Sequence, residues 1–179
     1  MNQMTNTSGR NMQIKTKDLV LTSLAMGLVY IATALGFELP ALNQGGYTHL
    51  GTGMIFTLAI LLGPKKGAIS GAIGSGLCDL ATGYAIWAPT TIITRGIMGY
   101  VVGCIARKDG NQGTSNIRNI ISMVVGGIIL LVGYYVGEAV TFGNWISPIN
   151  SVIPNLIQVV VGLPVTLLLT GSIKKTKII

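Results

Sequence analysis

The stretch Leu62-Gly63-Pro64-Lys65-Lys66-Gly67-Ala68 is a basic turn between two apolar spans. Its two adjacent lysines are positively charged, whereas the flanking spans, 49–63 and 67–80, contain one acidic residue and no Lys or Arg. Lys and Arg accumulate in the short cytoplasmic loops of membrane proteins. The turn therefore predicts two transmembrane helices that are joined on the cytoplasmic side.

Basic clusters of the same kind recur along the chain. Eleven of the twelve Lys and Arg residues fall into four clusters, which are Arg10/Lys15/Lys17, Lys65/Lys66, Arg107/Lys108/Arg118 and Lys174/Lys175/Lys177. Consecutive clusters are separated by enough apolar chain to cross a membrane twice. The predicted spans are 19–37, 49–63, 67–80, 89–106, 119–142 and 152–173. The pattern predicts an all-α integral membrane protein, a compact six-transmembrane-helix bundle with both termini cytoplasmic.

The three predicted outer connections differ from the basic turns. Segments 38–48, 81–88 and 143–151 contain no Lys or Arg. The span 67–80 is the shortest of the six and falls short of the roughly 20 residues that cross a bilayer. We therefore expect 81–88 to fold back over a cavity at membrane depth, where irregular backbone is tolerated only if protein or water surrounds it.

Composition supports a membrane protein. Half of the 179 residues are hydrophobic and 9% are charged, whereas soluble domains have about 25% charged residues. The net charge of +7 is explained by the cytoplasmic clusters, so we expect no binding of nucleic acid. Cys78 and Cys104 show neither a disulfide pattern nor the spacing of a zinc site.

The N-terminal region admits two interpretations. We expect a polar cytoplasmic segment, 1–17, followed by a single membrane domain, 18–175. The alternative is a signal peptide over 1–34, with Ala32-Thr33-Ala34 as its cleavage site. The basic region is long for a signal peptide, and no soluble domain follows that would need export, so we favour a first transmembrane helix.

Polar residues from five spans align in the outer half of the membrane. A rise of about 1.5 Å per helical residue places them roughly 18–30 Å from the nearest basic cluster. Their side chains and the aromatic residues of the outer loops suit a flat, polar heterocycle, which stacks on its faces and forms hydrogen bonds at its edges. The predicted substrate-binding residues are Tyr47, His49, Asp79, Tyr84, Trp87, Thr91, Arg95, Tyr134, Glu138, Asn155 and Gln158.

Arg95 is the one basic residue inside an apolar span. Ionisable side chains at this depth pair with one another or mark a substrate path. One hypothesis is a structural ion pair with Asp79, with Glu138 as the alternative acid; the other is that Arg95 contacts substrate and Asp79 orients it. His49 follows a Gly-rich segment and is either the pivot of a gate or a site residue.

Small residues recur at four-residue spacing and permit close approach of helices. The two stripes are Ser23/Gly27 and Gly67/Gly71/Ser75. Each stripe packs against other helices of the chain or docks on a partner membrane subunit.

The sequence contains no recognised motif for nucleotide binding or for hydrolytic catalysis. The chain has no nucleotide-binding Gly-rich loop, no HExxH and no GxSxG. We therefore expect no ATP hydrolysis by the chain itself, no catalytic residues, no metal and no cofactor.

Several runs resemble the S components of energy-coupling factor (ECF) vitamin transporters, in particular the riboflavin, hydroxymethylpyrimidine and pyridoxine types. The runs are Tyr47-Thr48-His49-Leu50-Gly51-Thr52-Gly53, Leu62-Gly63-Pro64-Lys65-Lys66-Gly67-Ala68, Gly71-Ala72-Ile73-Gly74-Ser75, Asp79-Leu80-Ala81-Thr82-Gly83-Tyr84-Ala85-Ile86-Trp87-Ala88-Pro89 and Thr94-Arg95-Gly96. The likeness covers most of residues 17–173. Many relatives have Lys where Arg95 stands, and many have an Asp near Gly53.

The resemblance implies a substrate-binding subunit in a bacterial cell membrane. Such a subunit captures a vitamin from outside and docks on a membrane scaffold subunit that carries two cytoplasmic ATPases. The scaffold contact would be Ser23/Gly27 or the Gly67/Gly71/Ser75 stripe. A pyridoxine- or hydroxymethylpyrimidine-like ring is slightly favoured over riboflavin as substrate. The alternatives are a stand-alone secondary carrier or channel and, third, a membrane enzyme.

Overall fold

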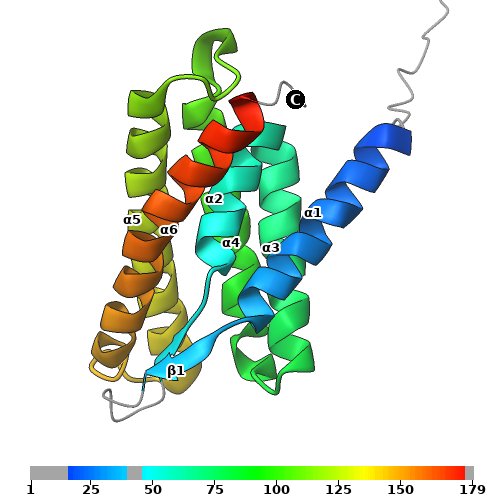
Figure 1. Cartoon of the computed structure of the whole chain (residues 1–179). Helices are drawn as coiled ribbons and strands as arrows, with labels where there is room; N and C mark the ends of the chain where they lie inside the picture. Colours follow the sequence, from blue (N-terminus) through cyan, green and yellow to red (C-terminus); the bar gives the residue numbers. More distant parts are fainter. Residues whose placement is uncertain (1–15, 40–45, 176–179) are drawn as a thin grey trace, which may run out of the picture.

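The computed structural model describes residues 16–39 and 46–175, and it shows a bundle of six α-helices (Figure 1). The helices are α1 (Thr16–Ala34), α2 (Gly51–Leu62), α3 (Pro64–Ala81), α4 (Ala88–Ala106), α5 (Asn116–Phe142) and α6 (Ile149–Lys175). Two single-turn 3₁₀ helices, η1 (Ala85–Trp87) and η2 (Lys108–Gly110), lie in the connections before and after α4. The predicted number of helices is confirmed in the described residues.

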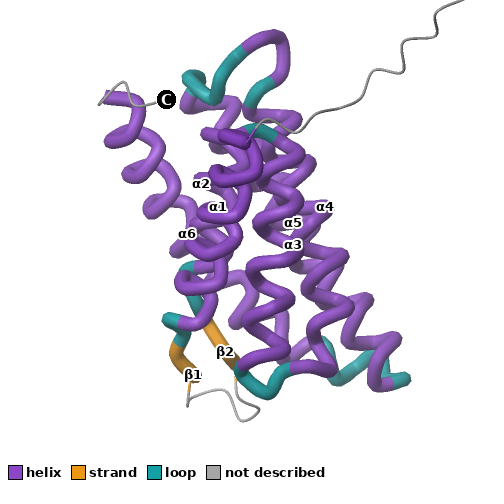
Figure 2. The backbone as a smooth tube through the Cα atoms, turned by 90° about the vertical axis from the view of Figure 1, so that its right-hand side faces the viewer, coloured by secondary structure: helices purple, strands orange, loops and turns teal. Residues whose placement is uncertain are grey.

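A short β-ribbon interrupts the helical pattern. Strand β1 (Phe37–Leu39) pairs antiparallel with β2 (Gly46–Thr48), with Phe37 opposite Thr48 and Leu39 opposite Gly46. The ribbon lies at one end of the bundle, next to the start of α2 (Figures 1 and 2). The predicted connection 38–48 thus contains local strand structure, which the all-α prediction did not include.

The two ends of the bundle differ in charge. The described chain begins and ends at the same end, where the α2–α3 turn and η2 also lie (Figure 1). This basic end carries every described Lys and Arg except Arg95, namely Lys17, Lys65, Lys66, Arg107, Lys108, Arg118, Lys174 and Lys175. The opposite end, the ribbon end, holds β1–β2, the α3–α4 connection with η1, and the α5–α6 connection.

The relative lengths of the second and third helices were predicted wrongly. The helix α3 has 18 residues, because Pro64 suits a first helical turn and Gly63, with φ +94°, turns the chain immediately before it. The helix α2, with 12 residues, is the shortest, since the ribbon occupies the residues before it.

The prediction that 81–88 folds back over a cavity is wrong. The connection turns at the surface of the ribbon end, and Ile86 has 57% of its surface exposed. Ala81, Thr82, Gly83 and Ala85 are also exposed. Because α3 continues as a helix to Ala81, no irregular backbone has to enter the bundle here.

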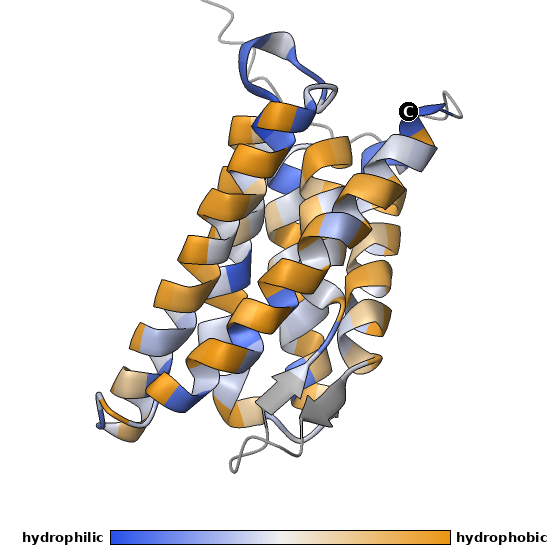
Figure 3. Cartoon of the chain, turned by 60° about the vertical axis from the view of Figure 1, so that its left-hand side comes forward, coloured by the Kyte–Doolittle hydropathy of each residue, from blue (hydrophilic) through white to orange (hydrophobic). Residues whose placement is uncertain are grey.

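The sides of the bundle are apolar. In the part of the chain that the structure describes, four helices are long and apolar enough to cross a membrane, namely α1, the α4 segment from Ala85, α5 and α6. Figure 3 shows hydrophobic residues along the outward faces of the helices, while hydrophilic residues gather in the loop at the basic end. Leu24, Ile97, Ile128 and Val160 are among the large side chains exposed on these faces. Such a surface suits contact with lipid.

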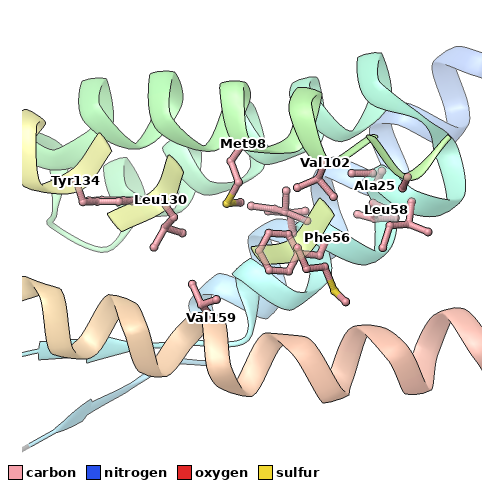
Figure 4. Packing of buried hydrophobic residues seen from close by; sticks show 14 residues of the cluster. Ala25, Phe56, Leu58, Met98, Val102, Leu130, Tyr134 and Val159 are labelled. Carbon is pink, nitrogen blue, oxygen red and sulfur yellow. The ribbon is translucent and has the colours of Figure 1, made fainter. Parts of the chain in front are cut away.

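The core combines large side chains with very close helix contacts. Phe56, Met98, Val102, Leu130 and Val159 pack together between α2, α4, α5 and α6 (Figure 4). Elsewhere backbones touch directly, because a Cβ added at position 99 in α4 would lie 2.4 Å from the carbonyl oxygen of Gly67 in α3. Only glycine permits this approach.

The two small-residue stripes have different environments. Gly67, Gly71 and Ser75 are buried inside the chain, where added Cβ atoms at the two glycines would meet α2 and α4. A partner subunit therefore cannot contact this stripe, which corrects one of the two expected interfaces. Ser23 and Gly27 are exposed on α1, and a Cβ at position 27 would meet nothing within 4 Å.

Candidate functional site

Arg95 is the centre of a buried polar cluster. Its side chain is only 2% exposed, although a guanidinium group is always charged. Nε donates a hydrogen bond to the Tyr134 hydroxyl (2.9 Å), and Nη2 donates to Oε1 of Gln158 (3.3 Å). Nη2 also lies 3.1 Å from Nε2 of His49, and the guanidinium carbon is 5.6 Å from the centre of the Tyr134 ring. Side chains from α5, α6 and the link between β2 and α2 thus surround the cation.

A second set of hydrogen bonds orients these partners. The hydroxyls of Thr91 and Tyr134 are 2.9 Å apart, and Thr52 Oγ1 donates to Oε1 of Gln158 over 3.1 Å. Gln158 Nε2 donates to Oδ1 of Asn155, at 3.5 Å. Residues one turn apart on a helix share a face. Thr91 therefore enters the cluster together with Arg95 on α4, and Asn155 enters it together with Gln158 on α6.

His49 connects the ribbon to this cluster. It lies between β2 and α2 and is buried. The backbone N–H of Gly51 donates to Nδ1 of His49 over 3.1 Å, so the ring is held at the first turn of α2 while Nε2 faces Arg95. Gly51 suits this position, because a Cβ would lie 2.3 Å from Thr33 Oγ1 and 2.9 Å from Nδ1 of His49, so both side chains would have to shift. The histidine therefore contacts the polar cluster and also shapes the entry into α2.

Asp79 does not pair with Arg95. The structural ion pair that we considered is not formed in the described part of the chain, and Glu138 is not the alternative partner. Among the described residues, Oδ2 of Asp79 is buried without a hydrogen-bond partner, and so is Nη1 of Arg95. A buried polar atom without a partner is costly. One unused acceptor on α3 and one unused donor on α4 are therefore candidates for contact with a ligand.

Glu138 lies one turn beyond Tyr134 on α5 and is 5% exposed. Its Oε2 accepts a hydrogen bond of 2.6 Å from Ser151 at the start of α6. This bond connects α5 and α6 toward the ribbon end, and Ser151 precedes Asn155 by one turn on the same helix.

The predicted aromatic residues lie farther out. Trp87 belongs to η1 and packs edge-on against Phe142, with the ring centres 5.1 Å apart. Tyr84 immediately precedes η1 at the ribbon end. The backbone of Tyr47 lies in β2, but its side chain is outside the described structure. The described contacts of Trp87 place it at the end of the bundle, away from the Arg95 cluster.

Sequence reasoning missed three polar residues. Thr52 is fully buried and bonds to Gln158, and Ser151 bonds to Glu138. Their spacing is a usable signal, because Thr52 follows His49 by three residues in an apolar span and Ser151 precedes Asn155 by four. Thr48, also missed, has a buried hydroxyl without a partner in the described part of the chain.

The donor set suits an organic ligand. Within the described residues, no three His, Cys, Asp or Glu side chains come together as a metal ion would need. The cluster offers a guanidinium, amides and hydroxyls, which recognise the edges of a polar ring.

Apolar outer faces and a buried polar cluster in the ribbon-end half define a multi-pass α-helical membrane protein with an internal candidate binding site. Residues 13–175 match the family model described as the S component of the ECF-type riboflavin transporter. The match covers most of the chain, so the protein belongs to this family of transporter S components.

Two relatives have curated descriptions. The "Thiamine precursor transporter HmpT" of Lactococcus lactis subsp. cremoris (strain MG1363) is 26% identical over 164 residues, which cover 91% of each chain. An "Uncharacterized protein in gap 3'region" of Pyrococcus woesei is 33% identical over 111 residues, which cover 62% of this chain and 72% of the relative. The relative that aligns over almost its full length is thus described as a thiamine precursor transporter.

Proposed function

We propose that the protein captures a small water-soluble vitamin or vitamin precursor from outside a bacterial cell and delivers it to an ATP-driven ECF module. The observation that carries this proposal is the buried Arg95, which has, among the described residues, one donor without a partner and no carboxylate within ion-pair distance. An isolated buried cation is costly, and a polar ligand would supply the missing acceptor. The relative that transports a thiamine precursor supports a pyrimidine- or pyridine-type ring over riboflavin.

The proposed binding residues divide by position. His49, Asp79, Thr91, Arg95, Tyr134, Asn155 and Gln158 would contact or orient the ring from inside the bundle. Tyr47, Tyr84 and Trp87 would line the entrance at the ribbon end, and Glu138 would hold α5 to α6 beside it. No residue would act as a catalyst.

We propose that the basic end faces the cytoplasm and that all six helices lie within the membrane. The positive-inside bias supports this orientation, because eight of the nine described Lys and Arg residues lie at one end. The short α2 then ends at the cytoplasmic side, where Arg107 satisfies its last carbonyls through bonds to Leu61 (2.6 Å) and Ile60 (3.3 Å).

The orientation can be tested by labelling single cysteines in a Cys78→Ser/Cys104→Ser background. A cysteine at the exposed positions Gly83 or Asn150 should react with an impermeant thiol reagent added to intact cells. One at Lys65 or Lys108 should react only after the membrane is permeabilised. Reaction at both ends from outside would contradict the proposed orientation.

The exposed α1 stripe, Ser23 and Gly27, is the proposed contact with the scaffold subunit. Its side chains are small, it lies on the outer side of the bundle, and it leaves room for a second helix, since a Cβ at position 27 meets nothing within 4 Å. Close helix packing in membranes depends on small residues of this kind.

Uptake into liposomes tests whether this protein binds the vitamin while the scaffold and ATPases drive its transport. The protein alone should bind its vitamin without accumulating it, whereas the protein with scaffold and both ATPases should accumulate it with ATP. Gly27→Leu should abolish this uptake and leave binding unchanged, because the position touches no other part of the chain. Concentrative uptake by the lone protein on an ion gradient would contradict the proposal and indicate a secondary carrier.

A further inference from the structure

We propose that the site reads a donor–acceptor edge on its ligand, with Nη1 of Arg95 bonding to a ring acceptor and Oδ2 of Asp79 accepting from an adjacent N–H or O–H donor. This inference rests on the proposed function and specifies the chemical class of the ligand. It assigns to Asp79 a direct ligand contact with a group that Arg95 does not touch.

The donor side of the pair is held in a fixed position. Nε and Nη2 of Arg95 are occupied by Tyr134 and Gln158, so the planar guanidinium cannot rotate freely. Nη1 is buried and has no partner in the described ranges 16–39 and 46–175. A fixed N–H donor that protein groups leave unused selects a ligand acceptor in its plane.

The acceptor side lies on the neighbouring helix. Helices α3 and α4 are in direct contact. A Cβ added at position 71 would lie 2.9 Å from the carbonyl oxygen of Arg95, and one added at position 76 would lie 2.5 Å from the side chain of Ile92. Asp79 follows position 76 by one turn, and its carboxyl group is close enough to interact with the Thr91 side chain through a hydrogen bond and with the charge of Arg95. Its Oδ2 is nevertheless buried and unused.

Two unused atoms of opposite hydrogen-bonding type on touching helices are complementary to a ring that carries an acceptor next to a donor. A nitrogen heterocycle with an amino group beside a ring nitrogen has this edge. The ring nitrogen would accept from Arg95, and the amino group would donate to Asp79. A carboxylate and a guanidinium both form charge-assisted hydrogen bonds, which are stronger than neutral ones.

A double-mutant cycle between ligand and protein tests the assignment. The probes are 4-amino-5-hydroxymethyl-2-methylpyrimidine and the same molecule without its amino group, titrated calorimetrically into the purified protein. The wild type should prefer the amino probe by about 30-fold or more, because a site built to bond a polar group rejects an analogue that lacks it. Asp79→Leu should reduce this preference to about 3-fold or less.

Two further variants serve as controls. Ser75→Ala removes a buried hydroxyl one turn before Asp79 that has no partner, and it should keep the full preference for the amino probe. Arg95→Lys should lower the affinity for both probes by the same factor and leave the ratio of the two affinities unchanged, since Arg95 is assigned to the ring nitrogen that both probes possess.

The outcomes separate this inference from the proposed function. Equal binding of the two probes by the wild type, or an unchanged preference in Asp79→Leu, would overturn the donor–acceptor assignment alone. If neither probe binds to the folded protein, both the assignment and the pyrimidine-type substrate are wrong.

Discussion

Arg95→Ala should abolish detectable ligand binding, lowering affinity by at least about 100-fold, which corresponds to about 2.8 kcal/mol. The variant loses the unused donor at Nη1 and also the bonds that position Tyr134 and Gln158. Each hydrogen bond to a charged group contributes about 1.5–3 kcal/mol. Calorimetric titration of the purified variant with the aminopyrimidine probe measures the loss.

The same variant should also be less stable, by about 2–3 kcal/mol in the free energy of unfolding, because buried polar partners remain without their donor. Arg118→Ala is the matched control. Arg118 lies at the basic end in a half-exposed ion pair with Asp109 at 3.3 Å, and such pairs contribute little. Binding near the wild-type level in Arg95→Ala would remove Arg95 from the ligand site.

Gly99→Ala should destabilise the protein by about 3 kcal/mol, since one added methyl group would press on the backbone of α3. A Cβ there would lie 2.4 Å from the carbonyl oxygen and 2.7 Å from the carbonyl carbon of Gly67. Backbone atoms cannot rotate away as a side chain can, so the two helices must separate. Thermal unfolding in detergent measures the effect.

Gly27→Ala is the control for this substitution. Position 27 also lies in a helix, but a Cβ there meets nothing within 4 Å. Alanine is about 1 kcal/mol more favourable than glycine in a helix interior, so this variant should unfold at the same temperature as the wild type or higher. Equal stability of Gly99→Ala and Gly27→Ala would contradict the close α3–α4 contact.

The charge pattern predicted well how far the polar site residues lie from the basic end of the bundle. Counting residues from each basic cluster placed His49, Arg95, Asn155 and Gln158 at similar depth, and the structure brings these four side chains into one hydrogen-bonded cluster. Helix count follows from the same pattern, because a cytoplasmic cluster must recur after every second crossing.

The direction in which each side chain points could not be obtained from depth alone. One of the two hypotheses paired Asp79 with Arg95 because they lie at similar height, yet Arg95 turns toward α5 and α6, where Tyr134 and Gln158 are bonded to it. The α3 stripe shows the same limit. Spacing identified Gly67 and Gly71 as sites of close approach, but the approaching helices belong to the chain itself.

Hydrogen bonding between strands could not be predicted in segment 38–48 either. The strands β1 and β2 have three residues each, too few for a period-two pattern to be recognised. The ribbon nevertheless matters for the site, because it leads directly into His49.

Native mass spectrometry of the protein purified from cells grown with thiamine precursors tests the central proposal most directly. The wild type should carry one molecule with the mass of a small vitamin or vitamin precursor, which collisional activation releases, and Arg95→Ala should carry none. A folded wild-type protein that carries only lipid, and that gains no adduct when vitamins are added, would contradict its function as a vitamin-binding S component.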